Sequence, residues 1–300
     1  RPKGIAPHDY TNINYTKTLW IAEGSTSYFE DHLMVRAGIE TTDEFFGTLT
    51  KTVNRHLQTP GREVQSATET SFDKWINQGG DHARNYSTNI YLEGALISMA
   101  LDIDLLEKSD GKISYRDVHR ALYNKHRLPD GFTPDDVKAI LKELTGRDYS
   151  AWWQANVDEP AAIDFDELLA KVGLGLIRPE GAKSVPSIDS FAKNSGELLT
   201  LTHVRRGGAA WQAGLTTDDK IVAFNKKHVG KDLTASLETF KAGDTVTVDF
   251  IRRDALQSTT LTLSEDFDKE KKVKALKDAT PAQMALFKAW MGVDHPNQAK

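Results

Sequence analysis

The sequence predicts a multi-domain protein, in which a mainly α-helical first part is followed by a smaller αβ module and a final helix. Three features of the 300 residues support this division. Apolar residues recur at helical spacing up to about residue 159, short β-type runs follow residue 160, and a last amphipathic segment begins near residue 281. We therefore expect three segments, with boundaries at 1–160, 161–266 and 267–300.

Helical spacing begins after Tyr15, where Ile21 and Tyr28 share a face and Gly38 stands where a helix-ending glycine is expected. The segment 90–106 is apolar on nearly every side, which predicts a helix buried within a bundle. Further helices are predicted over residues 42–58, 115–125, 133–145 and 149–156.

The αβ module shows apolar runs of strand length separated by turn residues, with Gly214 and Gly243 as stops for two short helices. Residues 179–194, rich in Ser, Lys and Pro, predict a mobile loop, and the lysine-rich segment 269–277 predicts a linker to the last helix. Strands are predicted over 198–204, 221–224, 245–251 and 258–263, and helices over 209–213, 234–241 and 281–291.

Charge and composition exclude several classes of function. Lys and Arg total 38 against 43 Asp and Glu, so the net charge is −5 and gives no electrostatic basis for a nucleic-acid partner. The absence of cysteine excludes disulfides and thiolate metal sites. The longest apolar stretch, 95–106, is shorter than the roughly 20 residues of a membrane helix. We expect a soluble protein of the cytoplasm or periplasm, and its oligomeric state is not readable.

The segment 19–29, LWIAEGSTSYF, carries the most chemical information. Glycine inside a helix costs about 1 kcal/mol relative to alanine, so Glu23-Gly24 indicates that something approaches the backbone closely. The segment resembles the second zinc helix of the glycyl aminopeptidase family, which are gluzincin zinc peptidases with a thermolysin-like catalytic domain. The resemblance implies that Glu23 is a zinc ligand; the alternative is a surface or salt-bridged glutamate. The flanking matches are Asp9-Tyr10, Asn14-Tyr15-Thr16 and Arg36-Ala37-Gly38.

The histidine ligands of such a site are missing from this chain. Its nine histidines include no pair at H-x-x-x-H spacing, and a catalytic zinc needs three protein ligands. The resemblance implies that Arg1-Pro2 begins just past the H-E-x-x-H helix, so that the chain is the C-terminal half of the peptidase. We expect this piece by itself to bind zinc weakly and to be inactive.

Two further polar residues follow Glu23 on the same helix. Ser27 lies one turn and Glu30 nearly two turns after it, so both share its side. Either could orient a metal ligand from a second layer of contacts, or both are ordinary polar groups of a helix surface.

The segment Tyr91-Leu92-Glu93-Gly94 is the second chemical feature. It resembles the gluzincin segment in which a tyrosine, three residues before a glycine, donates a hydrogen bond to the oxyanion of the tetrahedral intermediate. The resemblance implies that Tyr91 is this catalytic donor; the alternative is a core tyrosine with a satisfied hydroxyl. Glu93 stands where relatives usually carry lysine, which changes the local charge.

Residues from about 165 to 265 resemble a bacterial PDZ domain, which binds an extended peptide as an added strand at a sheet edge. The resemblance implies an edge strand at 198–204, with Leu198, Leu199 and Leu201 in the peptide groove. The matching residues are Gly173–Leu176, Val204–Ala210 and Ala213–Leu215, while Thr217-Asp218 stands where a glycine is usual.

Two functions of different kinds follow. The first is a zinc-dependent aminopeptidase, as the whole protein, that hydrolyses N-terminal residues from peptide substrates by zinc-activated water, with Gly or Ala favoured as the family name implies. The second is a non-catalytic peptide-binding or scaffolding protein, whose PDZ-like groove holds a peptide ligand. The PDZ-like module either delivers substrates or acts only as a packing partner.

Overall fold

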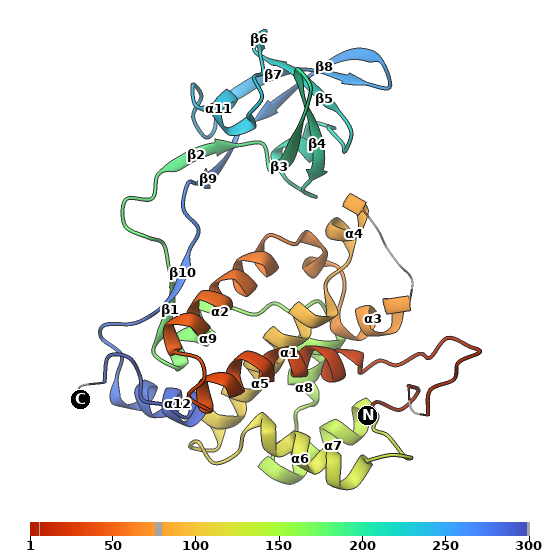
Figure 1. Cartoon of the computed structure of the whole chain (residues 1–300), viewed down its shortest axis with the longest axis vertical. Coiled ribbons are helices and arrows are strands. Elements are labelled where there is room, and N and C mark those ends of the chain that lie inside the picture. Colours follow the sequence, from red (N-terminus) through yellow and green to blue (C-terminus); the bar gives the residue numbers. More distant parts are fainter. Residues whose placement is uncertain (6, 76–79, 299–300) are drawn as a thin grey trace. The chain divides into compact units, whose positions relative to one another are not determined.

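The computed structural model describes residues 1–5, 7–75 and 80–298, and combines helices in the first part of the chain with a sheet-rich later part (Figure 1). The chain forms two compact units. The helical unit comprises Arg1–Gln78, Tyr86–Ile177 and Lys271–Lys300, and the sheet unit comprises Gly79–Asn85 and Arg178–Glu270. Among the described residues, no helix combines the length and apolar character needed to cross a bilayer.

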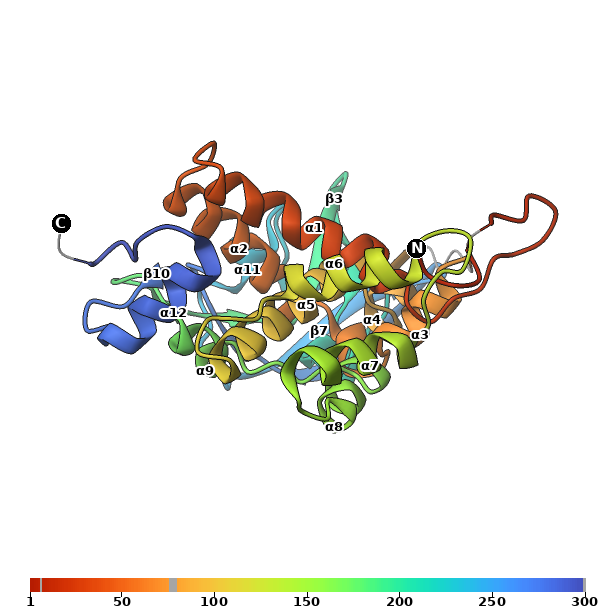
Figure 2. The ribbon, with the colours of Figure 1, turned by 90° about the horizontal axis from the view of Figure 1, so that it is seen from below.

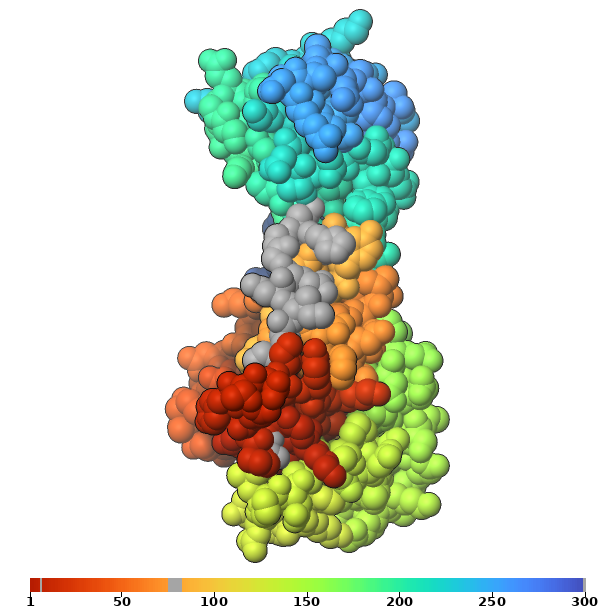
Figure 3. All heavy atoms as spheres, turned by 90° about the vertical axis from the view of Figure 1, so that its right-hand side faces the viewer, coloured from red at the N-terminus to blue at the C-terminus, as the bar shows by residue number. Residues whose placement is uncertain are grey.

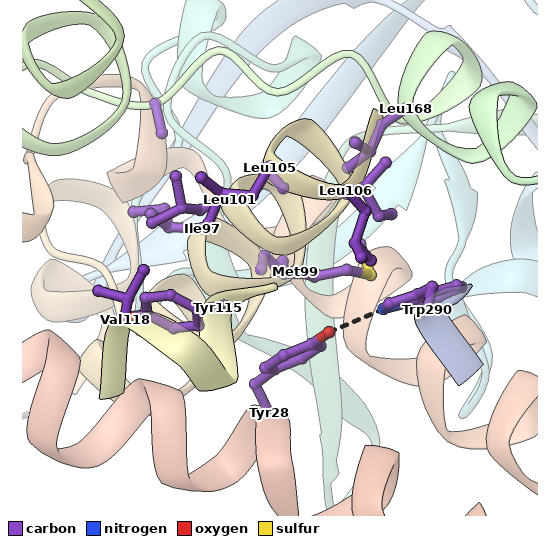
Figure 4. Packing of buried hydrophobic residues seen from close by; sticks show 14 of the residues in the cluster. Tyr28, Ile97, Met99, Leu101, Leu105, Leu106, Tyr115, Val118, Leu168 and Trp290 are labelled. Atoms are coloured by element: carbon purple, nitrogen blue, oxygen red, sulfur yellow. Dashed lines mark hydrogen bonds between the residues drawn. The ribbon is translucent and has the colours of Figure 1, made fainter. Parts of the chain in front are cut away.

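Helix α5 (Ile90–Lys108) forms the centre of the helical unit and packs against helices α1, α2, α3, α6, α9 and α12 (Figure 2). Because it is apolar on nearly every side, it can bury residues all round, and Ile97, Leu101 and Leu105 are fully buried. Figure 4 shows these side chains packed with Tyr115 and others of the same core. The predicted buried helix is confirmed.

The other helices of this unit begin at polar caps that the sequence carries. Thr41, Ser66, Thr133 and Thr280 form capping boxes with the side chains three residues on. The helices are α1 (Leu19–Arg36), α2 (Thr42–Leu57), α3 (Ala67–Phe72), α6 (Tyr115–His126), α7 (Pro134–Thr145), α8 (Ser150–Trp153), α9 (Phe165–Lys171) and α12 (Pro281–Met291), with short helical turns η1 (Pro60–Glu63), η2 (Asp73–Trp75) and η3 (Gln154–Asp158).

Both ends of the chain belong to the helical unit. Pro2 forms a parallel bridge with Phe132, and Figure 3 shows the red N-terminal residues against the yellow-green surface of α6 and α7. At the other end, Trp290 Nε1 of α12 donates to the hydroxyl of Tyr28, 2.7 Å away (Figure 4). The Tyr28 hydroxyl in turn donates to the buried carboxylate of Asp102. This buried chain of hydrogen bonds fixes α12 on the core.

The division differs from the predicted segments on either side of the sheet unit. Residues 161–177 and 271–300 belong to the helical unit, because strand β1 (Leu174–Ile177) pairs antiparallel with β10 (Lys272–Ala275). Leu174 is fully buried and Val273 nearly so, in the helical core. A two-stranded sheet of the helical unit is therefore formed by two segments that were predicted otherwise. One is Gly173–Leu176, which resembles a PDZ motif, and the other is the lysine-rich segment predicted as a linker.

The sheet unit contains a six-stranded antiparallel sheet with the strand order β3-β4-β5-β7-β8, to which β6 adds by pairing with β5. Its core includes the fully buried Leu201, Ile221 and Val248. The elements are β2 (Ser184–Ser187), β3 (Ser190–Ser195), β4 (Leu198–Val204), β5 (Lys220–Phe224), β6 (Lys227–His228), β7 (Thr245–Arg252), β8 (Ala255–Thr262), β9 (Ser264–Phe267), and the helices α4 (Gly80–Tyr86), α10 (Ala209–Gln212) and α11 (Leu233–Leu237).

Two sequence predictions in this unit are wrong. The expected mobile loop at 179–194 contains β2, which pairs with β9, and most of β3, which pairs with β4. The strand expected at a free edge, β4, is interior, because it pairs with β3 along its length and with β5 at Leu199 and Thr200. Leu199 and Leu201 are buried in the core and Leu198 is half-buried, so these three residues do not line an edge groove.

Candidate active site

The two sequence motifs meet where helices α1 and α5 cross. A Cβ atom built on Gly24 would lie 2.4 Å from the Cα of Gly94, and one built on Gly94 would lie 2.9 Å from the Cα of Gly24. Both values are below any normal contact, so only glycine fits at either position. Next to them, the hydroxyl of Ser25 bonds that of Ser98 at 3.1 Å. The close approach predicted from Glu23-Gly24 is therefore made by the glycine of the other motif.

This crossing brings the two candidate chemical groups together. Partial burial, followed by the charge of the nearby Glu23 carboxylate and hydrogen bonding to it, raises the pKa of the Tyr91 phenol above its ordinary value. Tyr91 is 43% exposed and Glu23 is half-buried, so both side chains remain accessible from solvent. The pair therefore presents a protonated phenol beside a carboxylate.

The start of α5 fixes the position of Tyr91. Asn89 is the N-cap, and its side-chain oxygen accepts from the backbone N–H groups of Tyr91 at 2.9 Å and Leu92 at 3.2 Å. Lys74 Nζ lies 5.7 Å from the centroid of the Tyr91 ring. Sequence reasoning missed Asn89, although an asparagine directly before an apolar helical run is a recognised helix-start signal.

Glu93, the departure from the family pattern, points into the protein instead of the site. Its Oε2 lies 2.9 Å from Nδ1 of His56, and both side chains are almost completely buried. The same oxygen accepts from the hydroxyl of Thr88 at 3.1 Å. Glu93 therefore links the first turn of α5 to α2, and its side chain contacts buried residues of the core.

Ser27 and Glu30 are the two residues expected to orient a metal ligand. Ser27 is half-buried, and its hydroxyl donates to the backbone oxygen of Glu23 in the same helix at 3.2 Å. Glu30 is exposed, where its charge helps to raise the pKa of Asp31 after burial of that carboxyl. Their role toward a metal ligand stays a prediction.

Among the described residues, Glu23 belongs to no group that could form a complete metal site. No group of three or more His, Cys, Asp or Glu side chains there could hold a metal ion. A zinc site needs three protein ligands. The described residues therefore do not supply a complete zinc site by themselves.

Two pockets of the helical unit flank the Glu23–Tyr91 pair. Glu23 and Thr26 line a pocket of about 450 Å³ that is closed by Leu122 and Phe132. Tyr91 lines the other, of about 290 Å³, which lies between α1, α2 and α5. Pockets with apolar walls and a few polar groups, such as Glu23 and Tyr91 here, are typical of sites that bind small molecules or peptides.

Comparison of the fold defines the class of protein as a peptidase relative. The crystal structure of an aminopeptidase N family protein from Idiomarina loihiensis matches 97% of this chain, with a TM-score of 0.82 and 27% sequence identity. The model of the M61 glycyl aminopeptidase family matches residues 1–97, which contain both Glu23 and Tyr91. This match and the structural match support the family predicted from the sequence.

The chain spans only 51% of the length of that aminopeptidase relative. A search of the curated proteins found no match. Weaker likenesses cover smaller shares of the chain: the HtrA-type protease AlgW with decapeptide matches 28% of this chain and 30% of its own, at TM-score 0.26 and 14% identity. A serine endoprotease from Yersinia pestis covers the same shares, at TM-score 0.25 and 20% identity. Scores this low carry no argument on fold or function.

Proposed function

We propose that this chain supplies part of the catalytic site of a zinc aminopeptidase, which removes N-terminal residues, small ones such as Gly or Ala, from peptides. The observation that carries the proposal is the close Gly24–Gly94 crossing, which brings the segments of Glu23 and Tyr91 together. Two residues 68 positions apart that match separate gluzincin motifs meet at one place, beside two pockets. The M61 match over both residues supports the same reading.

Tyr91 is proposed to stabilise the negative charge that develops when water attacks the scissile carbonyl. Its pKa is raised, so the phenol keeps its proton at neutral pH and can donate it in a hydrogen bond. The asparagine cap at Asn89 and the crossing glycines hold the ring in place before substrate binds. Such fixed donors act because they need no reorganisation as the charge forms.

Glu23 is proposed to be one zinc ligand within the whole protein, with the other ligands outside this chain. A zinc ion at such a site lowers the pKa of its bound water and polarises the carbonyl. Because the described residues offer no group of three ligands, we expect the chain by itself to be inactive and to bind zinc weakly. The sheet unit is proposed to be a PDZ-like accessory domain, with its peptide partner still to be identified.

The test compares Tyr91→Phe and Glu23→Gln in the full-length protein, with alanyl and glycyl amides as substrates. Tyr91→Phe should lower kcat about 100- to 1,000-fold with unchanged zinc content, because one oxyanion donor is lost. Glu23→Gln should lower both zinc content and activity. Zinc is measured by elemental analysis of the dialysed proteins.

Tyr10→Phe is the matched control, because Tyr10 is 93% exposed and removal of its hydroxyl should change nothing. Full activity in Tyr91→Phe would exclude Tyr91 as the donor. Unchanged zinc in Glu23→Gln would exclude Glu23 as a ligand. If the wild type hydrolyses no peptide at all, the peptide-binding function becomes the better reading.

A further inference from the structure

The pocket of about 290 Å³ in the helical unit adjoins the proposed catalytic donor. Tyr91 and Ser27 both line it, and it lies between helices α1, α2 and α5. Its inner wall is made by four side chains that are each at least 94% buried: Phe45, Leu49, Leu96 and Met99.

The chemistry of this wall selects one kind of occupant. A charged or strongly polar group placed against Phe45, Leu49 and Met99 would lose its hydration without gaining a partner. An apolar group would gain from leaving water, roughly in proportion to the area it buries. The volume lies at the lower end of ligand pockets, which span roughly 300–1,000 Å³, so it suits a single side chain better than a whole peptide.

The rim of the pocket is polar and suits a peptide main chain. Asp31 of α1 and Arg55 of α2 both line it, together with Thr52. Arg55 is exposed and Asp31 is half-buried, so their heads lie near the opening while the apolar wall lies below. A substrate can therefore place its amide groups among acceptors and donors and its side chain inside.

We propose that this pocket is the subsite for a large apolar side chain, such as that of leucine or methionine, on the substrate residue that follows the cleaved bond, because the residue before the bond is proposed to be small. The assignment rests on the proposed peptidase function, because Tyr91 both lines the pocket and faces Glu23. A side chain that fills the pocket belongs to a residue whose carbonyl or amide lies within reach of the Tyr91 hydroxyl. The pocket thus makes the site selective for substrates with such a residue.

The test uses the full-length protein and two peptide series, Xaa-Ala-amide and Ala-Xaa-amide, with Xaa being Gly, Leu, Met or Lys. In the Ala-Xaa-amide series, kcat/KM for Leu and Met should exceed that for Gly and Lys by about 10- to 100-fold, as pockets for apolar side chains discriminate. The Xaa-Ala-amide series, in which Xaa precedes the cleaved bond, is the control and should not favour Leu and Met. Equal rates for all four residues in the Ala-Xaa-amide series, or a preference for Leu and Met in the Xaa-Ala-amide series only, overturn the proposal.

Ala95→Leu tests the pocket directly, because Ala95 lines it, is half-buried and can carry a larger side chain into the open space. This variant should lose the preference for Leu over Gly, because kcat/KM for the Leu peptide should fall more than kcat/KM for the Gly peptide. Ala95→Ser adds little volume and should keep the preference. Ala139→Leu makes the same change on the exposed face of α7 and should also keep it.

The outcomes separate the two proposals. If the wild type is active, Tyr91→Phe is inactive and Ala95→Leu still prefers Leu, the subsite is wrong and the peptidase function stands. If the wild type cleaves nothing, or Tyr91→Phe is fully active, the proposed catalytic role fails and the subsite falls with it. Thermal unfolding of each variant, with a midpoint close to that of the wild type, shows that lost selectivity is not lost folding.

Discussion

Gly24 and Gly94 lie in backbone contact, since a Cβ on Gly24 would approach the Cα of Gly94 to 2.4 Å. Each glycine lies close to a motif residue: Gly24 directly follows Glu23, and Gly94 comes three residues after Tyr91. The same contact therefore sets the distance between the helices and the distance between the two candidate catalytic groups. Stability and function should respond together to a change at this crossing.

Gly24→Ala should destabilise the chain by about 1–3 kcal/mol, the usual cost of forcing an extra group into a packed core. The added methyl meets backbone atoms of α5, which cannot move aside as a flexible side chain would. Urea unfolding followed by far-UV circular dichroism measures the loss. In the full-length protein, peptidase activity should fall with it.

Gly47→Ala is the matched control for this prediction. Gly47 lies inside α2, is exposed, and an added Cβ there would meet nothing within 4 Å. Alanine should therefore stabilise the helix by about 0.5–1 kcal/mol. Equal effects of the two substitutions would show that the crossing is not tightly packed.

Asp218→Gly should stabilise the sheet unit by about 1 kcal/mol. Asp218 adopts φ +71° at the position where the PDZ-like resemblance expects glycine, and its side chain is exposed. An L-residue is strained in this left-handed conformation, and glycine is not. The midpoint of urea unfolding of the sheet unit, followed by hydrogen exchange of its strands, measures the gain.

Asp189 is the matched control for Asp218, because it also has a positive φ, of 54°, but its side chain makes a hydrogen bond. Its Oδ2 accepts from the backbone N–H of Ala209 at 2.9 Å. Asp189→Gly relieves the same strain and loses this bond, so it should bring no gain or a loss. A clear stabilisation by Asp189→Gly would contradict the reasoning from strain and hydrogen bonding.

Stability should fall as the pH is lowered from about 6.5 to 4, in part through His119. Burial lowers the pKa of His119 to about 4, so the folded chain keeps the imidazole neutral while the unfolded chain binds a proton below its ordinary pKa of about 6.5. The resulting loss at pH 4 is up to roughly 3 kcal/mol. His32, also with a pKa lowered to about 4 by burial, acts in the same direction.

His119→Phe should reduce this dependence, because phenylalanine keeps the edge contacts with Phe29 and Tyr115 and takes up no proton. Urea unfolding at pH 7.5, 6.0 and 5.0 measures the slope for wild type and variant. His228→Gln, at an exposed strand position, should leave the slope as it is. An unchanged slope in His119→Phe would place the acid sensitivity elsewhere.

Helical positions were predictable because the apolar spacing and the end signals of a helix lie within one short segment of the sequence. Spacing and caps predicted α2, α5, α6, α7 and α12 closely, and α12 was predicted with its observed limits. The motif glutamate and tyrosine were predictable as candidates because their neighbours in sequence are distinctive. These signals are short-range, so one helix or motif is enough to show them.

What only the tertiary structure decided depends on partners distant in the chain. The sequence did not show that Gly24 is packed by Gly94, that β1 pairs with β10 almost one hundred residues later, or that β4 is interior. The pairing of strands and the crossing of helices depend on which buried faces fit together in the folded chain. The periodicity of one segment does not identify the segment that packs against it. The sequence by itself therefore predicted the family and the chemical candidates, and the packing of α1 against α5 decided that these candidates lie close together.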